Sequence, residues 1–232
     1  MTRVAGAARV ALVAVLLLGA CGGDDDEGDG GGQRVVLEDD FSDAASGFTV
    51  SESDTGSLAY DDGAYVIEAY GPNSLKVSDT DLDGEAFVAG LRELGDVRIE
   101  VDIAKASDDG PSLLGVLCRL NTDSPAYYAA LFDTDGYWRL VRFAGTTTVL
   151  AQAGERTKVG GLEGDDAHRL RLDCVDRPGG TAVALMLDGE PVAASVDPSP
   201  LPAGRAAMAA GTRDDSTHVL ARFDDLEITA LG

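Results

Sequence analysis

Residues 97–103 read VRIEVDI, and this stretch decides the fold class. Four β-branched apolar residues alternate with three charged ones, which is the period-two pattern of a strand with one buried face and one solvated face. Residues 168–174, HRLRLDC, repeat the alternation. A helix would need apolar residues three and four positions apart, so both stretches predict strands.

Many further stretches of the chain show alternation or short apolar runs. We predict strands over residues 65–70, 97–103, 113–120, 127–133, 137–143, 147–151, 168–174, 181–187, 192–196, 206–211 and 219–229. Asp135-Gly136 and Asp188-Gly189 each separate two of these stretches, as hairpin turns do. Only residues 85–94 could hold a helix longer than one turn, so the pattern predicts an all-β sandwich or barrel.

The order of these elements resembles the concanavalin A-like lectin/glucanase jelly rolls of the laminin G and 3-keto-disaccharide hydrolase kind. The matching pieces are EDDF at 38–41, GAYVI at 63–67, GVLCR at 115–119, YY at 127–128, DGY at 135–137, LDG at 187–189 and FDDL at 223–226. The resemblance implies an antiparallel jelly-roll β-sandwich over residues 35–232. This fold hosts lectins, hydrolases and structural modules alike, so the resemblance does not name the function.

The N-terminus has the features of a targeting segment. Residues 1–20 combine Arg3 and Arg9 with an unbroken apolar run at 10–18, as a secretory signal does. LGAC at 18–21 resembles the lipobox of bacterial lipoproteins, which implies that Cys21 is acylated; an ordinary signal peptide cleaved nearby would leave Cys21 unmodified. Residues 21–34 are acidic and rich in Gly, which predicts a flexible tether. We therefore expect an exported protein, anchored by lipid to the outer face of the cell membrane.

The charge balance excludes one class of partner. The chain has 18 Lys and Arg against 41 Asp and Glu, a formal charge of −23. Charge of this sign and size repels phosphate backbones, so we expect no nucleic acid as a partner.

Two cysteines remain once Cys21 is assigned to lipid. Cys118 and Cys174 both alternate in phase with apolar neighbours, and exported proteins seldom leave two thiols free. A redox-active pair would need an exposed, electropositive setting, whereas these flanks are apolar. We expect a structural disulfide between Cys118 and Cys174.

The sequence contains only the first part of a known glucanase catalytic motif. Laminarinase-type glucanases carry a strand with Glu-x-Asp-x-x-Glu, in which one Glu is the nucleophile and the last Glu is the acid/base. Glu100 and Asp102 match the start of this motif, but Lys105 stands at the last position and Ala104 at the shorter-spaced alternative. We interpret these residues as strand-face charges, and His168 and His218 as structural residues. The sequence therefore favours a protein that is not an enzyme.

Calcium is the one cofactor that the sequence leaves open. Asp79, Asp81 and Asp83, followed by Gly84, match the first half of a calcium-binding loop. The closing bidentate Glu is absent, because Gly90 stands at the twelfth position. An acidic surface segment without metal is the favoured interpretation.

The register of the hairpin at Asp135-Gly136 decides which of its side chains face solvent. A two-residue loop pairs Phe132 with Arg139, whereas a three-residue loop with left-handed Gly136 pairs Phe132 with Trp138. We favour the second register because it gathers a set of large apolar residues on one buried face. The set is Tyr128, Ala130, Phe132, Trp138 and Leu140.

In that register Tyr127, Tyr137 and Arg139 point outward, joined by Arg119 from the neighbouring strand. Aromatic rings stack on sugar C–H faces and guanidinium groups donate to hydroxyls, so these four residues are the candidate ligand site. The alternative is that they stabilise the hairpin by cross-strand pairing and bind nothing.

Three functions remain open. We favour a non-catalytic, envelope-tethered module that binds a glycan or another envelope component. An accessory or structural lipoprotein with a protein partner is a close alternative, and would show a large exposed apolar patch. A glycoside hydrolase of the 3-keto-disaccharide type follows from the resemblance alone, and would show two carboxylates about 5–10 Å apart in a cleft.

Overall fold

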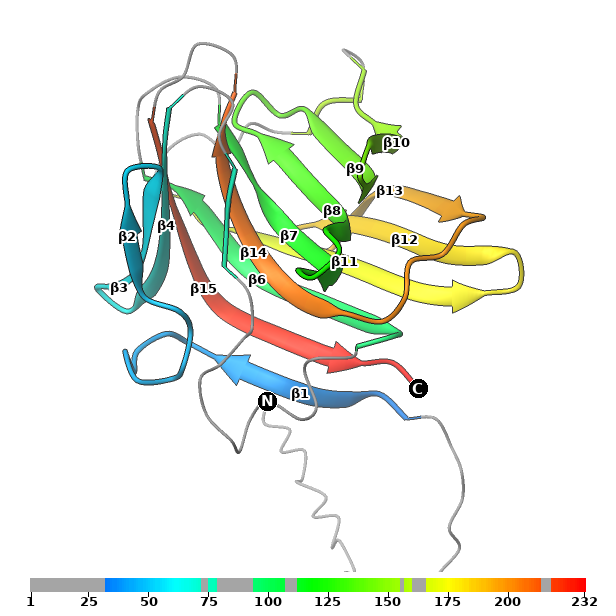
Figure 1. Ribbon diagram of the computed structural model, residues 1–232, viewed down its shortest axis with the longest axis horizontal. Helices are drawn as coiled ribbons and strands as arrows, with labels where there is room; N and C mark the ends of the chain where they lie inside the picture. Colours follow the sequence, from blue (N-terminus) through cyan, green and yellow to red (C-terminus); the bar gives the residue numbers. More distant parts are fainter. Residues whose placement is uncertain are drawn as a thin grey trace, which may run out of the picture. The chain divides into compact units, whose positions relative to one another are not determined.

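The computed structural model describes residues 32–71, 75–78, 94–106, 112–154, 157–159, 166–213 and 218–232. Within these ranges the regular elements are strands, which pair antiparallel and form two sheets packed face to face (Figure 1). The jelly-roll β-sandwich expected from the sequence is confirmed. The described part of the chain contains no helix long and apolar enough to cross a membrane. Residues 1–31 and 79–93, which include Cys21 and the candidate calcium ligands, lie outside the described residues.

The larger sheet has nine strands. Their spatial order is β13 (Glu190–Asp197), β12 (Gly180–Leu187), β11 (His168–Arg177), β6 (Val97–Lys105), β15 (His218–Ala230), β4 (Ala64–Tyr70), β3 (Gly56–Asp61) and β2 (Ser51–Ser53), with β1 (Arg34–Asp39) beside β15. β15 is long enough to serve two neighbours on one side, because β4 pairs with its first half and β1 with its second half.

The smaller sheet has six strands. Their spatial order is β10 (Thr147–Gln152), β9 (Trp138–Ala144), β8 (Ala126–Asp133), β7 (Ser112–Asn121), β14 (Arg205–Thr212) and β5 (Leu75–Val77).

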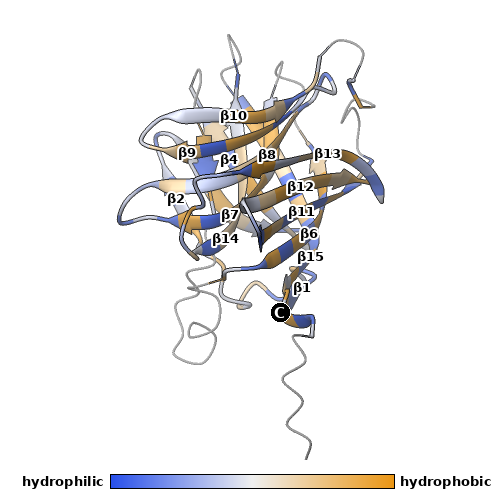
Figure 2. Ribbon diagram, turned by 90° about the vertical axis from the view of Figure 1, so that its right-hand side faces the viewer, coloured by the Kyte–Doolittle hydropathy of each residue, from blue (hydrophilic) through white to orange (hydrophobic). Residues whose placement is uncertain are grey.

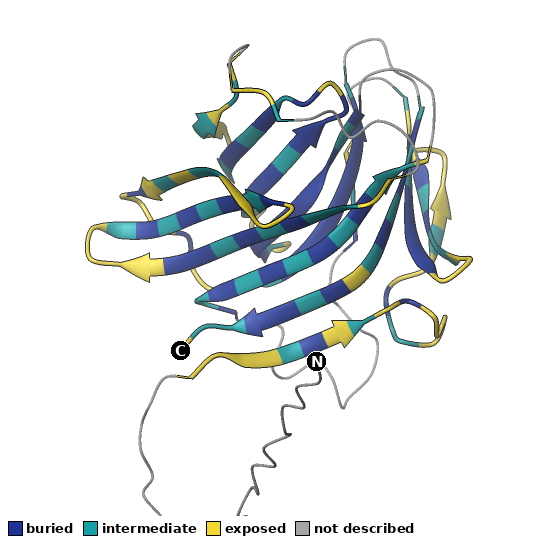
Figure 3. Ribbon diagram, turned by 180° about the vertical axis from the view of Figure 1, so that it is seen from behind, coloured by how far each residue is buried: buried dark blue, intermediate teal, exposed yellow. Residues whose placement is uncertain are grey.

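The alternation at residues 97–103 becomes the two faces of β6. Its four apolar residues are buried between the sheets, while its charged residues lie half-buried on the outer face. The same banding of buried and half-buried residues runs along the neighbouring strands (Figure 3), and apolar and polar residues alternate with it (Figure 2). Each large apolar side chain placed in this core stabilises the fold by about 1.5–3 kcal/mol.

Every predicted stretch overlaps one strand of the structure. Four strands were not predicted, namely β1, β2, β3 and β5. β2 and β5 have three residues each, too few to show a period. These four strands are held by hydrogen bonds to neighbouring strands. Such pairing depends on the fold, so it cannot be seen in the residues of the strand itself.

The hairpin between β8 and β9 has the favoured register. Phe132 pairs with Trp138, and Gly136 is left-handed, with a φ of 87°. The Gly136 amide donates to the Asp133 carbonyl at 2.9 Å. All five residues assigned to one buried face are buried: Tyr128, Ala130, Phe132, Trp138 and Leu140.

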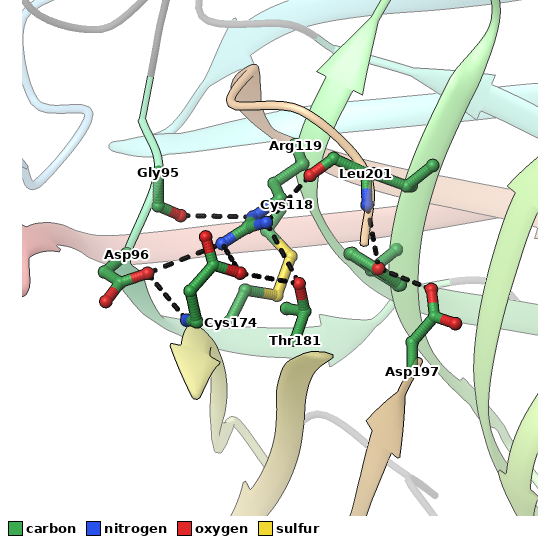
Figure 4. Close-up of a disulfide and its surroundings, with 10 residues drawn as sticks. Gly95, Asp96, Cys118, Arg119, Cys174, Thr181, Asp197 and Leu201 are labelled. Atoms are coloured by element: carbon green, nitrogen blue, oxygen red, sulfur yellow. Dashed lines mark hydrogen bonds and ion pairs between the residues drawn. A yellow bond between two sulfur atoms is a disulfide. The ribbon is translucent and has the colours of Figure 1, made fainter. Parts of the chain in front are cut away.

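The Cys118–Cys174 disulfide is present and joins the two sheets (Figure 4). Cys118 lies on β7 and Cys174 on β11, and both are fully buried. The bridge spans 56 residues of chain, for which loop-closure entropy gives a stabilisation of about 4 kcal/mol.

Candidate functional site

The hairpin of β8 and β9 places six side chains on the outside of the six-stranded sheet, away from the core. We call these six residues the β8–β9 outer face. They form three cross-strand pairs, which are Tyr127 with Phe143, Ala129 with Val141, and Leu131 with Arg139. Ala129 and Val141 belong to a second hydrophobic cluster, separate from the core between the sheets. Because side chains alternate along each strand, these six residues lie on the opposite side of the sheet from the core.

Tyr127 and Phe143 form a stacked aromatic pair on this face. Their ring centroids lie 5.2 Å apart and their planes differ by 17°. Both side chains are half-buried, and burial raises the pKa of the Tyr127 phenol. The Tyr127 hydroxyl has no hydrogen-bond partner among the described residues. The pair thus presents two half-buried aromatic rings, each with one face against the other, and a hydroxyl that meets no partner in the described part of the chain.

The sequence prediction missed Phe143. Once Arg139 is taken as outward, the period of two puts Val141 and Phe143 on the same side of β9. That alternation was available in the sequence, so parity alone could have found the second ring of the pair.

Arg139 lies half-buried on the same face, opposite Leu131 on one side and Gln152 on the other. It makes no ion pair or hydrogen bond with the part of the chain that the structure describes. The predicted outward orientation of Tyr127 and Arg139 therefore agrees with the structure. Ligand binding by either residue stays a prediction.

Exposure rises across the outside of the six-stranded sheet, from β14 and β7 towards β10. Leu117, Ala207 and Ala209 are buried in the second hydrophobic cluster. Val149, which pairs with Val141 at the edge of the sheet, is 48% exposed. The accessible part of this surface is consequently the β8–β10 side, where Tyr127, Phe143 and Arg139 lie.

Tyr137 is partly covered by the segment that follows β10. The ammonium nitrogen of Lys158 lies 3.7 Å from the centroid of the Tyr137 ring. The Trp138 indole donates to the Thr157 carbonyl at 2.9 Å, and the Val159 amide donates to the Gly136 carbonyl at 3.1 Å. One face of the Tyr137 ring is thus occupied by a cation and is not available for stacking on a sugar.

The placement of Arg119 corrects the sequence prediction. Arg119 is only 2% exposed and cannot point outward beside Tyr127. The pairing of β7 with β8 shifts between Cys118 and Asn121, and Arg119 adopts a left-handed φ of 54° in this bulge. The bulge breaks the alternation and turns the side chain into the end of the sandwich (Figure 4).

The buried Arg119 guanidinium is surrounded by five acceptors from four other segments. Its partners are the Gly95 carbonyl at 3.2 Å, Thr181 Oγ1 at 3.0 Å, the Leu201 carbonyl at 2.8 Å, Asp96 Oδ1 at 3.4 Å and Asp176 Oδ1 at 2.9 Å. Hydrogen bonds from Thr181 and Arg119 hold the pKa of Asp176 below its usual range. Arg119 therefore ties the end of the sandwich together and is not a ligand residue.

Glu100 and Asp102 lie on the outer face of the nine-stranded sheet, not beside the hairpin. Asp102 is paired with Arg169 at 3.2 Å, as expected for strand-face charges. One strand further along, Asp173 is half-buried, but hydrogen bonds from Arg171 and Arg98 outweigh burial and lower its pKa. The two histidines also have carboxylate neighbours, since His168 contacts Asp188 and His218 contacts Glu68.

A pocket of about 470 Å³ opens beside β1 on the same sheet. It is lined by Glu38, Asp39, Asp40, Arg169, Asp225, Leu226 and Glu227. The described residues contain no group of three or more His, Cys, Asp or Glu side chains arranged to hold a metal ion. Asp79, Asp81 and Asp83 fall outside the described residues, so calcium binding there stays a prediction.

Comparison with known proteins identifies the fold. No protein-family model matches the chain, and no curated protein matches it significantly. A Bacillus subtilis protein of unknown function with a galectin-like fold matches with a TM-score of 0.56 and 12% identity, over 84% of this chain and 96% of that chain. The Bacillus licheniformis β-glucanase matches with a TM-score of 0.52 and 10% identity, over 83% of this chain and 96% of that one.

The catalytic domain of an endo-1,3-β-glucanase (laminarinase) from Thermotoga petrophila RKU-1 matches in the same way, with a TM-score of 0.53 and 12% identity, over 86% of this chain and 98% of that domain. Sequence identities this low show a shared fold and do not show a shared function. The chain is a jelly-roll β-sandwich of the kind found in galectin-like and glucanase structures.

Proposed function

We propose that this chain is a non-catalytic carbohydrate-binding module whose glycan lies across the β8–β9 outer face. The observation that carries the proposal is the stacked pair of Tyr127 and Phe143, with Arg139 on the same face and without an ion-pair partner among the described residues. Aromatic faces stack on the C–H faces of sugar rings, and a guanidinium donates up to five hydrogen bonds to hydroxyls. Two of the similar structures are named as glucanases, which supports carbohydrate as the ligand class.

The proposed face lacks the groups for glycoside cleavage. Retaining and inverting glycosidases use two carboxyl groups that flank the scissile bond. The six strands of this sheet contain a single carboxylate, Asp133. Asp133 is buried and forms an ion pair with Arg213, so its role is structural. Among the described residues of these six strands, groups for stacking and hydrogen bonding are present, whereas a pair of carboxyl groups to act as proton donor and nucleophile is not.

A hydrolase of the 3-keto-disaccharide type is a second candidate, favoured by a different observation. Asp102 and Asp224 are register partners on the nine-stranded sheet, and burial raises the pKa of Asp224. A raised carboxyl pKa is one property of a general acid, and a carboxylate beside it is another part of a glycosidase site. If this candidate is correct, Asp224→Asn abolishes cleavage of a glycoside by the purified protein.

We also propose that the module is exported and held at the membrane through Cys21. This rests on the apolar run at 10–18 and the LGAC sequence at 18–21, followed by the acidic Gly-rich residues 21–34. A tether of that composition would let the sandwich reach away from the anionic membrane surface, which the negative charge of the chain favours.

The test is binding of the purified protein to a glycan array, followed by titration of the best ligand. Tyr127→Ala and Phe143→Ala should each weaken binding by about tenfold, because one stacked ring contributes on the order of 1 kcal/mol or more. The matched control is Tyr70→Ala. Tyr70 is also an exposed, stacked aromatic, but it lies beside His218 on the nine-stranded sheet.

The proposal fails if the wild-type protein retains no glycan, or if Tyr70→Ala weakens binding as much as Tyr127→Ala. An envelope protein that co-purifies through the β8–β9 outer face, without any glycan bound, would favour the accessory-protein function instead.

A further inference from the structure

Arg139 differs from most other arginines in the described part of the molecule. Arg98, Arg142 and Arg222 each lie within 3.0 Å of a carboxylate oxygen, and Arg169, Arg171 and Arg213 are also paired with acids. Among the described residues Arg139 has no such partner, although the chain has more than twice as many acids as bases. A half-buried guanidinium that meets no carboxylate in the described part of the chain, on a face proposed to bind a ligand, can take an anion from outside.

The surroundings of Arg139 favour an anionic group over a hydroxyl. Its strand neighbours are the apolar Leu131 and the neutral Gln152, so neither competes for the guanidinium. An apolar setting with reduced access to water strengthens a charge-assisted hydrogen bond. Carboxylates and sulfate esters both match the forked donors of an arginine.

We infer that the ligand is an acidic oligosaccharide, with its carboxylate or sulfate group bound by Arg139 and one of its sugar rings stacked on Tyr127 and Phe143. This inference rests on the proposed function. Arg139 and Phe143 lie four residues apart on one side of β9, which corresponds to about 13 Å along a strand. A single sugar ring does not span this distance, so the ligand has at least two residues and lies along the strand over Val141.

The negative charge of the whole chain does not contradict an acidic ligand. The acids concentrate elsewhere: β8, β9 and β10 contain one carboxylate, Asp133, and it is neutralised by Arg213. At physiological salt the screening length is about 8 Å, so carboxylates on the opposite sheet act only weakly on a ligand at Arg139. Distant repulsion slows the approach of the ligand more than it weakens the bound state.

The experiment uses one oligosaccharide in two chemical forms. Binding of an oligoglucuronate to the full-length protein is compared by calorimetry with binding of its carboxyl-reduced counterpart, which has the same rings and no charge. A sulfated neutral oligosaccharide forms a third arm and separates sulfate from carboxylate as the preferred group. Wild-type protein should bind an acidic form about tenfold or more tightly than the reduced form.

Arg139→Gln should weaken binding of the acidic forms by about tenfold more than binding of the reduced form, which removes the preference, while Arg139→Lys should keep part of it. Arg34→Gln is the matched control, because Arg34 is exposed on β1 of the other sheet. Equal binding of charged and uncharged forms by the wild type, or an unchanged preference in Arg139→Gln, overturns the inference.

The two proposals fail in different ways. Loss of binding of the reduced form in Tyr127→Ala, with no preference for the acidic forms, leaves the proposed function standing and removes the inference. Absence of binding to all three forms, and to every glycan of the array, removes both.

Discussion

Asp102 of β6 and Asp224 of β15 are register partners, so two carboxylates lie opposite each other on the outer face of the nine-stranded sheet. Burial raises the pKa of Asp224, and the charges of Asp225, Asp102 and Asp40 add to this effect. On β11, beyond β6, Asp173 has a lowered pKa because its two arginine partners outweigh burial. One sheet face therefore contains carboxylates whose ionisation has opposite effects on stability.

Asp224→Asn should stabilise the protein at neutral pH. A carboxyl group with a raised folded-state pKa makes the fold less stable as pH rises through the unfolded and then the folded pKa. Because Asp224 is partly exposed, the gain is at most about 1 kcal/mol. Urea unfolding should show this gain at about pH 7 and no difference from wild type at about pH 3. Equal stability of the two proteins at neutral pH would contradict the prediction.

Asp173→Asn should have the opposite effect. A lowered pKa means that the ionised carboxylate stabilises the fold above its unfolded pKa, and that this contribution is lost as pH falls through the lower folded pKa. Removing the charge leaves Arg98 and Arg171 without their shared partner and costs about 1–2 kcal/mol at neutral pH. The same urea titrations measure it, and the loss should shrink in acid. A loss that is independent of pH would indicate a packing effect instead.

Arg119→Met should destabilise the protein strongly, by about 3 kcal/mol, because it leaves the buried Leu201 carbonyl and Thr181 hydroxyl, and the Gly95 carbonyl, without their donor. Thermal unfolding measures the loss. Glycan binding by the folded variant should be unchanged, since the Arg119 side chain contacts Leu201, Thr181 and Asp176 and is not part of the β8–β9 outer face. A folded Arg119→Met protein that loses glycan binding would return Arg119 to the ligand site.

Reduction of the Cys118–Cys174 bridge should lower the free energy of unfolding by up to about 4 kcal/mol. A non-reduced digest analysed by mass spectrometry should contain the two cysteine peptides joined. The Cys118→Ala/Cys174→Ala double variant should resemble the reduced protein in its melting temperature. A melting temperature that reduction leaves unchanged would mean that the bridge contributes no stability.

Cys21→Ala should release the protein from the membrane fraction into the soluble fraction. A lipid chain contributes about 0.8 kcal/mol per buried methylene, whereas the acidic chain itself is repelled by anionic lipids. Cell fractionation with an antibody against the sandwich measures this. A Cys21→Ala protein that stays with the membrane would place the anchor elsewhere.

The sequence predicts a strand correctly when one face of the strand is buried and the other meets solvent. The period of two is visible in β6 because one face meets the core and the other meets solvent. The hairpin register also followed from local chemistry, since Gly136 tolerates the left-handed conformation that the three-residue loop requires.

The parts that were not predictable depend on contacts between distant segments. Arg119 is turned inward by a bulge whose position is set by pairing with both β8 and β14. A Cβ atom at Gly204 would lie 2.6 Å from the backbone carbonyl carbon of Arg119, so a glycine 85 positions later makes room for that bulge. The ammonium group that lies over the Tyr137 ring likewise belongs to a distant residue, Lys158, which follows β10.

The pairing of β1 with the second half of β15 has a mechanical consequence. The chain enters the sandwich at Arg34, and β1 is bonded to β15 from Arg34 to Asp39. A force along β1 would load its ladder in shear, so that several bonds share the load, whereas a force across β1 would break them one by one from Arg34. β15 passes this load to β6 in the middle of the sheet. If the module is held by its N-terminus in a moving fluid, the time it stays folded under load is set by its rate of forced unfolding.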